Sequence, residues 1–247
     1  MPKVSGGWNV IALHTWNKAA ITKLLWALAF KTDKLWVKWV HAYYVKSGSL
    51  WNLEVPAQAS WALKKILGCR TIVNASGGWQ QFRKNGIYSI QRAYSLLRDQ
   101  APKVNWRTLI CHNTATPKSV FILWLMLQDK LATCDRLVKW LPNISPLCSL
   151  CLAHDENVQH LFFDCHFSAA VWNRMLLLLQ QNKFCGSTIH ELRRVLWQSR
   201  KRSSRSRLYV SCFTKTVYEV WRQRNTKLHQ GTAPDPAIAY SNILFRL

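Results

Sequence analysis

Three cysteines and one histidine between residues 148 and 165 constrain this chain more than any other feature of its sequence. They follow the spacing Cys148-x2-Cys151-x8-His160-x4-Cys165. Three thiolates and an imidazole are suitable ligands for a tetrahedral zinc ion, and four protein ligands leave no open position for catalysis. A Cys-x2-Cys pair alone is a weak signal, but the added histidine and third cysteine predict one structural Zn²⁺ held by these four residues.

Two other histidines lie near this cluster and compete for the imidazole position. His154 would make a cramped Cys-x2-Cys-x2-His loop, and His166 directly follows Cys165 and would crowd it. We therefore favour His160, and the alternative for the whole segment is a reduced, metal-free loop. Asp155 is expected to cap a short helix that carries His160, and Glu156 is expected at the positive end of that helix.

The net charge of the chain is the second constraint. Its 247 residues include 34 Lys and Arg but 11 Asp and Glu, which gives a formal charge of +23. An excess of this size favours a polyanionic partner, RNA or DNA first, over a membrane surface. No apolar run reaches the roughly 18 residues that a membrane-spanning helix needs. The 8 Cys are too few and too unevenly placed for a disulfide-stapled secreted domain, which indicates a reducing compartment.

Seven cations are concentrated just before the last long apolar stretch. They are Arg193, Arg194, Arg200, Lys201, Arg202, Arg205 and Arg207. We interpret this segment as a nucleic-acid-binding surface or a nuclear-localisation signal, and the alternative is a solvated connector between two helices. Residues 148–165 contain no Lys or Arg and three acids. A polyanion is therefore expected to avoid the zinc segment, and replacing Asp155 and Glu156 with Gln is expected to do little harm to nucleic-acid binding or to strengthen it slightly.

A second group of cations lies beside aromatic residues near the start of the chain. The lysines are Lys31, Lys34, Lys38 and Lys46, and the aromatic residues are Trp36, Trp39, Tyr43 and Tyr44. Base stacking combined with phosphate contacts uses these residue types. Because the aromatic residues follow helical spacing, we favour the alternative, a buried aromatic stripe with lysines at its rim.

Apolar periodicity predicts a mainly α-helical protein: a helical bundle with one small β-hairpin and a CCHC zinc knuckle. Asp33 is expected to cap one helix, and Gly68 is expected to end the next. The hairpin is predicted around Asn85–Gly86, because Asn-Gly supplies the positive φ angles of a tight turn. The other expected helices cover residues 14–30, 59–67, 90–98, 104–111, 117–130, 135–140, 168–181, 189–197, 208–229 and 237–247.

Several motifs follow one another in a recognisable order. They are Gly86–Ile87–Tyr88–Ser89 with Ala93–Tyr94, then Pro117–Lys118, Phe121 and Trp124, then the four zinc ligands with Leu161–Phe162–Phe163 and Val171–Trp172. Together they resemble the reverse-transcriptase zinc-binding domain of plant LINE-type (non-LTR) retrotransposons. The resemblance implies a thumb-like helical segment over residues 1–75, the zinc-binding domain over 76–185 and a basic helical C-terminal tail over 186–247.

The residues of a polymerase active site are missing from this sequence. Such a site needs paired aspartates to hold two metal ions, and none of the seven Asp is adjacent to another. We therefore predict a chain that is not an enzyme: a non-catalytic, zinc-stapled RNA/DNA-binding domain. It is expected in the nucleus, with the cytoplasm as the alternative location. The alternative function is a domesticated protein–protein adaptor or structural subunit of a larger assembly, which includes a ribonucleoprotein.

Overall fold

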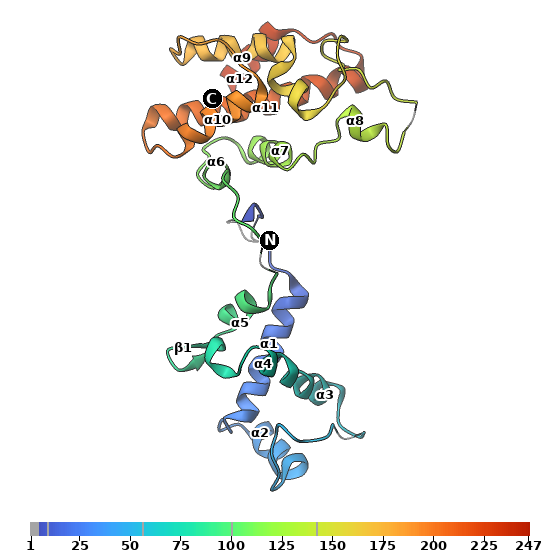
Figure 1. The fold of residues 1–247 in the computed structure, drawn as a ribbon, viewed down its shortest axis with the longest axis vertical. Helices are drawn as coiled ribbons and strands as arrows, with labels where there is room; N and C mark the ends of the chain where they lie inside the picture. The colour runs from blue at the N-terminus through green and yellow to red at the C-terminus, as the bar shows by residue number, and fades with distance from the viewer. Residues whose placement is uncertain (1–4, 9, 56, 100, 142) are drawn as a thin grey trace. The chain divides into compact units, whose positions relative to one another are not determined.

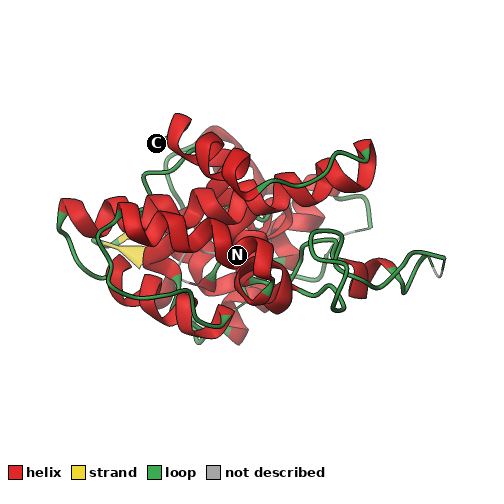
Figure 2. Ribbon diagram, turned by 90° about the horizontal axis from the view of Figure 1, so that it is seen from above, coloured by secondary structure: helices red, strands yellow, loops and turns green. Residues whose placement is uncertain are grey.

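The computed structural model describes residues 5–8, 10–55, 57–99, 101–141 and 143–247. Figure 1 traces the chain, and Figure 2 shows helices as nearly all of its regular structure. Two compact units, Met1–Pro102 and Lys103–Leu247, each contain a hydrophobic core. The prediction of a mainly α-helical fold with a two-stranded hairpin is confirmed. Within the described ranges, no helix is both long enough and apolar enough to cross a membrane.

Helix α1 (Leu13–Ala29) is the centre of the first unit. Its buried face includes Ala19, Leu25 and Leu28, and it packs against α5, α3 and α2. The elements that follow α1 are α2 (Leu35–Val40), a π-helical turn (His41–Val45), α3 (Trp61–Gly68), α4 (Arg70–Ala75), a 3₁₀ turn (Trp79–Phe82), β1 (Arg83–Lys84), β2 (Ile87–Tyr88) and α5 (Ile90–Leu97).

The hairpin joins the core of the first unit. Asn85 and Gly86 adopt φ angles of 52° and 79°, the left-handed conformations that its tight turn requires. Each strand is only two residues long, and the residues just before the first strand form a 3₁₀ turn that buries Phe82. The Tyr88 hydroxyl donates to the Ala19 carbonyl at 2.8 Å. The core therefore continues past residue 75, and the three-segment division at residues 75 and 185 stays a prediction.

Two helix boundaries in this unit differ from the expected ones. Asp33 forms an ion pair with Lys38, with 2.6 Å between Oδ1 and Nζ, and α2 has no side-chain cap. Gly68 is the last residue of α3, and Cys69 keeps right-handed helical backbone angles, so that α4 follows almost directly. The α4 helix was not predicted. The Ser60 hydroxyl caps the start of α3, where it accepts a hydrogen bond from the backbone N–H of Leu63.

Helix α11 (Ser204–Gln230) is the centre of the second unit and packs against α7, α9, α10 and α12. Ser203 caps its start, and Gly231 ends it with a φ of 68°. Its Phe213 stacks on Phe163 with 5.0 Å between ring centroids, and Trp172 meets Phe213 edge-on. The other elements are α6 (Arg107–Cys111), α7 (Pro117–Leu127), α8 (Cys134–Leu137), a π-helical turn (His160–Asp164), α9 (His166–Leu178), α10 (Thr188–Ser199) and α12 (Pro236–Phe245).

Candidate metal centre and basic cleft

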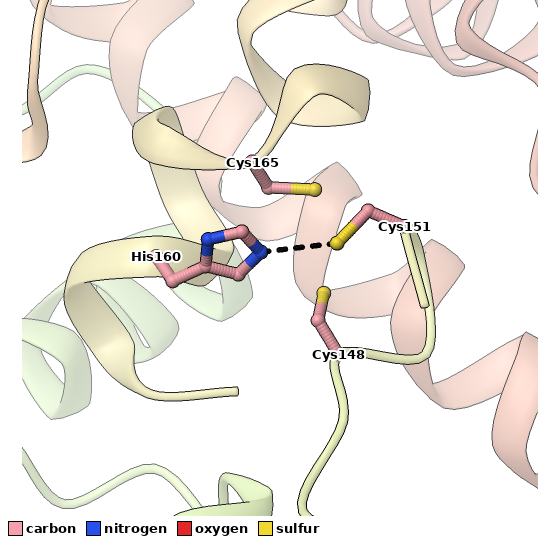
Figure 3. A group of neighbouring side chains, drawn as sticks. All are labelled: Cys148, Cys151, His160 and Cys165. Carbon is pink, nitrogen blue, oxygen red and sulfur yellow. Dashed lines mark hydrogen bonds between the residues drawn. The ribbon is translucent and has the colours of Figure 1, made fainter. Parts of the chain in front are cut away.

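The four predicted zinc ligands come together in the second unit (Figure 3). The thiol sulfurs of Cys148, Cys151 and Cys165 and a ring nitrogen of His160 all lie within 4.8 Å of one another. The cysteine pair lies on one loop, His160 begins a π-helical turn, and Cys165 directly precedes α9. The His160 Nε2 atom is 3.2 Å from the Cys151 sulfur, so this nitrogen faces the cluster. The arrangement fits a closed, four-ligand zinc site.

Backbone hydrogen bonds fold the loop that carries the cysteine pair. The Leu152 N–H donates to the Cys148 carbonyl at 2.8 Å, and the Cys148 N–H donates to the His154 carbonyl at 2.8 Å. Leu152 adopts a φ of 57°, which reverses the chain after the second cysteine. An antiparallel bridge between Leu147 and Asp155 closes the loop at its base. The loop therefore brings both thiols toward His160 and Cys165 (Figure 3).

Hydrogen bonding and burial shift the pKa values of the cluster side chains. The hydrogen bond between Cys148 and Cys165 raises the pKa of the Cys148 thiol, with burial as the second cause, and lowers the pKa of the Cys165 thiol. Backbone amides of Phe167 and Ser168, in the first turn of α9, also lower the pKa of Cys165. Burial lowers the pKa of His160, which favours the neutral imidazole that metals bind. A zinc ion held by these residues would bind the three cysteines as thiolates, so each thiol would release its proton on binding.

Neither of the two competing histidines belongs to the cluster. The ring centroid of His154 lies 5.2 Å from that of His160, and both His154 and His166 are exposed. The backbone N–H of His160 donates to the Asn157 side-chain oxygen at 2.8 Å, and this bond fixes the start of the turn that carries His160. That bond makes Asn157 the residue that caps this turn. The expected cap, Asp155, pairs with Leu147 instead.

Glu156 has a different role from the expected one. Its side chain is fully buried, and it forms an ion pair with Arg224 of α11, with 2.7 Å between Oε1 and Nη2. The same carboxylate accepts the backbone N–H of Cys134 at 2.9 Å. Arg224 is itself only 3% exposed. Glu156 therefore connects the loop of the candidate metal centre to α8 and α11, and does not act through the end of a helix.

The seven cations of the predicted nucleic-acid segment do not share one surface. Arg193 and Arg194 lie in α10, residues 200–202 form the turn, and Arg205 and Arg207 lie in the first turns of α11. Arg194 donates to the buried carboxylate of Glu191. Arg205 reaches the Leu179 carbonyl at 3.4 Å. The connector between the two helices is therefore short, because α11 begins at Ser204, four residues before its predicted start.

Four of these cations line one open cleft of about 680 Å³ in the second unit. They are Arg200, Lys201, Arg202 and Arg207. The cleft is also lined by Thr108, His112 and Thr114, in and just after α6. The Thr108 hydroxyl lies 2.8 Å from that of Ser199 at the end of α10, which joins the two sides. Among the described lining residues there is no Asp or Glu, so the cleft is strongly electropositive.

Sequence reasoning missed the α6 side of this cleft. Thr108 and Ser199 are 91 residues apart in the chain, and no spacing rule connects a threonine and a histidine near residue 110 to a basic run near residue 200. Arg193, Arg194 and Arg205 do not line this cleft; Arg205 lines a neighbouring one of about 430 Å³ beside Gln180 and Tyr209. Four of the seven predicted residues therefore line this cleft, and the other three do not.

A comparison with known protein families supports the assignment of these four residues to a zinc-binding segment. Residues 88–172, which include all four cluster residues, match the family model described as zinc-binding in reverse transcriptase. The predicted resemblance to a reverse-transcriptase zinc-binding domain is therefore confirmed, and the matched segment begins in the hairpin of the first unit and ends in α9 of the second.

Among curated proteins, an uncharacterized mitochondrial protein of Arabidopsis thaliana is 32% identical to this chain over 79 residues. That alignment covers 31% of this chain and 54% of the relative, so the chain spans about half the length of the curated relative it matches. No solved structure matches the chain.

Proposed function

We propose that this chain is a non-catalytic nucleic-acid-binding domain, stapled by one zinc ion and derived from the C-terminal part of a LINE-type retrotransposon reverse transcriptase. The observation that carries the nucleic-acid part is the cleft between α6 and the α10–α11 turn. Four cations and four hydroxyl-bearing threonine or serine residues line it, without a described acid among them. These groups bind phosphate oxygens irrespective of base identity.

The arginines of the cleft suit phosphate better than lysines would. A guanidinium donates two parallel hydrogen bonds to one phosphate and keeps its charge at any physiological pH. Arg200, Arg202 and Arg207 are exposed, so they reach a backbone without first breaking a buried ion pair. Lys201 stacks its ammonium over Trp197, with 3.1 Å to the ring centroid. The three arginines are thus the main phosphate contacts of the proposal.

The zinc ion has a structural role in this proposal. Cys148, Cys151, His160 and Cys165 would hold it, and bonds from the ion to these residues would fix the loop to the start of α9. The π-helical turn from His160 and helix α9 both pack against α11, the helix that carries Arg207. Zinc binding would therefore order the helices that form the cleft, while the acidic loop itself stays away from phosphate.

Salt dependence tests the proposal directly. We would measure binding of the full chain to a fluorescent single-stranded oligonucleotide by anisotropy, over a series of salt concentrations. Replacing Arg200, Arg202 and Arg207 with Gln should reduce the log–log salt slope by about 2, because each single-strand phosphate contact contributes roughly 0.7. The loss of affinity should be the same for all base sequences, since phosphates carry no sequence information.

A charge-matched variant controls for the overall loss of positive charge. Lys130, Arg174 and Lys183 are exposed cations of the same unit that do not line the cleft. Their replacement by Gln removes the same charge and should change the slope much less. If both triple variants behave alike, the cleft is not the binding surface. If binding by the parent chain is insensitive to salt, the adaptor function is the better account.

Nuclear localisation is part of the proposal and rests on the same cations. A fluorescent fusion of the full chain should accumulate in the nucleus, and the Arg200/Arg202/Arg207→Gln variant should do so less. Equal distribution of the parent fusion between nucleus and cytoplasm would contradict this part alone.

A further inference from the structure

The aromatic residues near the start of the chain are divided between two environments. Trp36 and Tyr44 pack against the core of the first unit, beside the buried Val37 and Val40. Trp39 and Tyr43 face solvent, with 54% and 57% of their surfaces exposed. The buried stripe that we favoured from helical spacing is therefore wrong for this second pair. Because many large apolar side chains of this chain are exposed, the geometry of this pair and the charges of its segment must show whether it binds a ligand.

The exposed pair is held in one geometry. The rings of Trp39 and Tyr43 are stacked, with 5.6 Å between centroids and 6° between planes. The half-buried Tyr44 meets both rings edge-on, at 5.4 Å from Trp39 and 4.8 Å from Tyr43. Tyr43 and Tyr44 belong to a π-helical turn, a local widening that is frequent at functional sites. Two parallel rings supported from the core form a stacking platform that needs no further ordering.

The charged residues in the segment that carries this platform are nearly all positive. Lys31, Lys34, Lys38 and Lys46 are exposed along the same stretch of chain, and Asp33 is the one acid among residues 31–46. Asp33 pairs with Lys38, which leaves three lysines for an external anion. An apolar protein partner would need no such excess of lysine, whereas a phosphate backbone next to stacked bases requires both features.

We infer that Trp39 and Tyr43 stack on unpaired bases of single-stranded nucleic acid, while Lys34 and Lys46 contact the adjacent phosphates. Base faces are hidden inside a duplex, so this surface favours single strands over double strands. It lies in the first unit and shares no residue with the cleft of the second unit. The inference therefore stands or fails separately from the proposed cleft.

An abasic strand separates stacking from phosphate contacts. We would compare binding of the full chain to an oligothymidylate and to an abasic strand of the same length. Replacing Trp39 and Tyr43 with Ala should weaken oligothymidylate binding roughly tenfold, because each stacked base contributes substantially to affinity. The abasic strand should bind parent and variant alike, and the salt slope should not change, since no phosphate contact is removed.

Trp61 gives a matched control in the same unit. It is 72% exposed on α3 and has the Lys65 ammonium 5.8 Å from its ring centroid, but no partner ring is stacked on it in the described structure. Trp61→Ala should leave binding of both strands unchanged. The inference is overturned if Trp39→Ala/Tyr43→Ala binds oligothymidylate as tightly as the parent, or if Trp61→Ala causes an equal loss.

A second measurement does not depend on a variant. A strand that carries 5-iodouracil should crosslink under ultraviolet light to Trp39 or Tyr43 of the parent chain, as mapped by peptide mass spectrometry. The Arg200/Arg202/Arg207→Gln variant should keep this crosslink even where its overall affinity falls. Crosslinks found only outside residues 31–46 in both proteins would overturn the inference and leave the cleft proposal intact.

Discussion

Neutralising Glu156 should strongly destabilise the second unit. Glu156→Gln keeps the shape of the side chain but removes the charge that Arg224 faces. The guanidinium of Arg224 donates to this carboxylate from Nε and Nη2, and the Cys134 N–H donates to it as well. With both partners at 0% and 3% exposure, water cannot take the place of the lost carboxylate.

The expected cost is about 3–5 kcal/mol, the range for removal of one partner from a buried ion pair, since the remaining charge is left uncompensated. An exposed ion pair in the first unit gives a comparison for this cost in stability. Asp33 and Lys38 have side chains 88% and 69% exposed, so Asp33→Asn should cost less than about 1 kcal/mol. For a unit of this size each kcal/mol lowers the melting temperature by roughly 2–4 °C, so Glu156→Gln should lower it by about 10 °C.

Thermal and urea unfolding of the full chain, followed by circular dichroism, would measure both changes. Arg224→Met and the double variant complete the cycle. The double variant should be more stable than the sum of the single losses predicts, because replacing both members of a buried pair leaves no orphan charge. Bound zinc should remain near one equivalent at low temperature in Glu156→Gln, since Glu156 is not among the four cluster residues. A cost below about 1 kcal/mol for Glu156→Gln would refute the assignment of this pair as a structural clamp.

Two further predictions concern the metal and the chemistry. Purified protein should contain about one equivalent of zinc, and Cys148→Ser should lose it and melt at a lower temperature; full zinc content and an unchanged melting temperature in that variant would exclude Cys148 as a ligand. Primer extension on an RNA template with magnesium or manganese should give no product above a blank, because the paired aspartates that hold two metal ions are missing; reproducible extension by the isolated chain would show that an active site was overlooked.

Features that depend on short stretches of chain were predictable from the sequence. The four cluster residues lie within 18 positions, so their spacing alone indicates a shared ion. The turn at Asn85–Gly86 is equally local, because two residue types supply the φ angles that it needs.

Features that depend on contacts between distant residues were not predictable. Glu156 and Arg224 are 68 positions apart, and nothing near Glu156 indicates that it is buried. The α6 side of the basic cleft was missed for the same reason. Helical spacing placed Trp39 and Tyr43 on one face of a helix, but spacing does not say whether that face meets the core or the solvent. That choice depends on how α2 packs, which only the folded unit shows.

The distance in sequence between Glu156 and Arg224 also imposes an order on folding during synthesis. The loop from Cys148 to Cys165 leaves the ribosome first, and Arg224 follows 68 residues after Glu156. At roughly 5–20 residues per second the interval lasts several seconds. During that time a zinc ion can already close the loop, while the Glu156 carboxylate remains hydrated because its partner does not yet exist. The metal would therefore be captured by a nascent, still open chain, and the Glu156 carboxylate would lose its hydration only when α11 arrives.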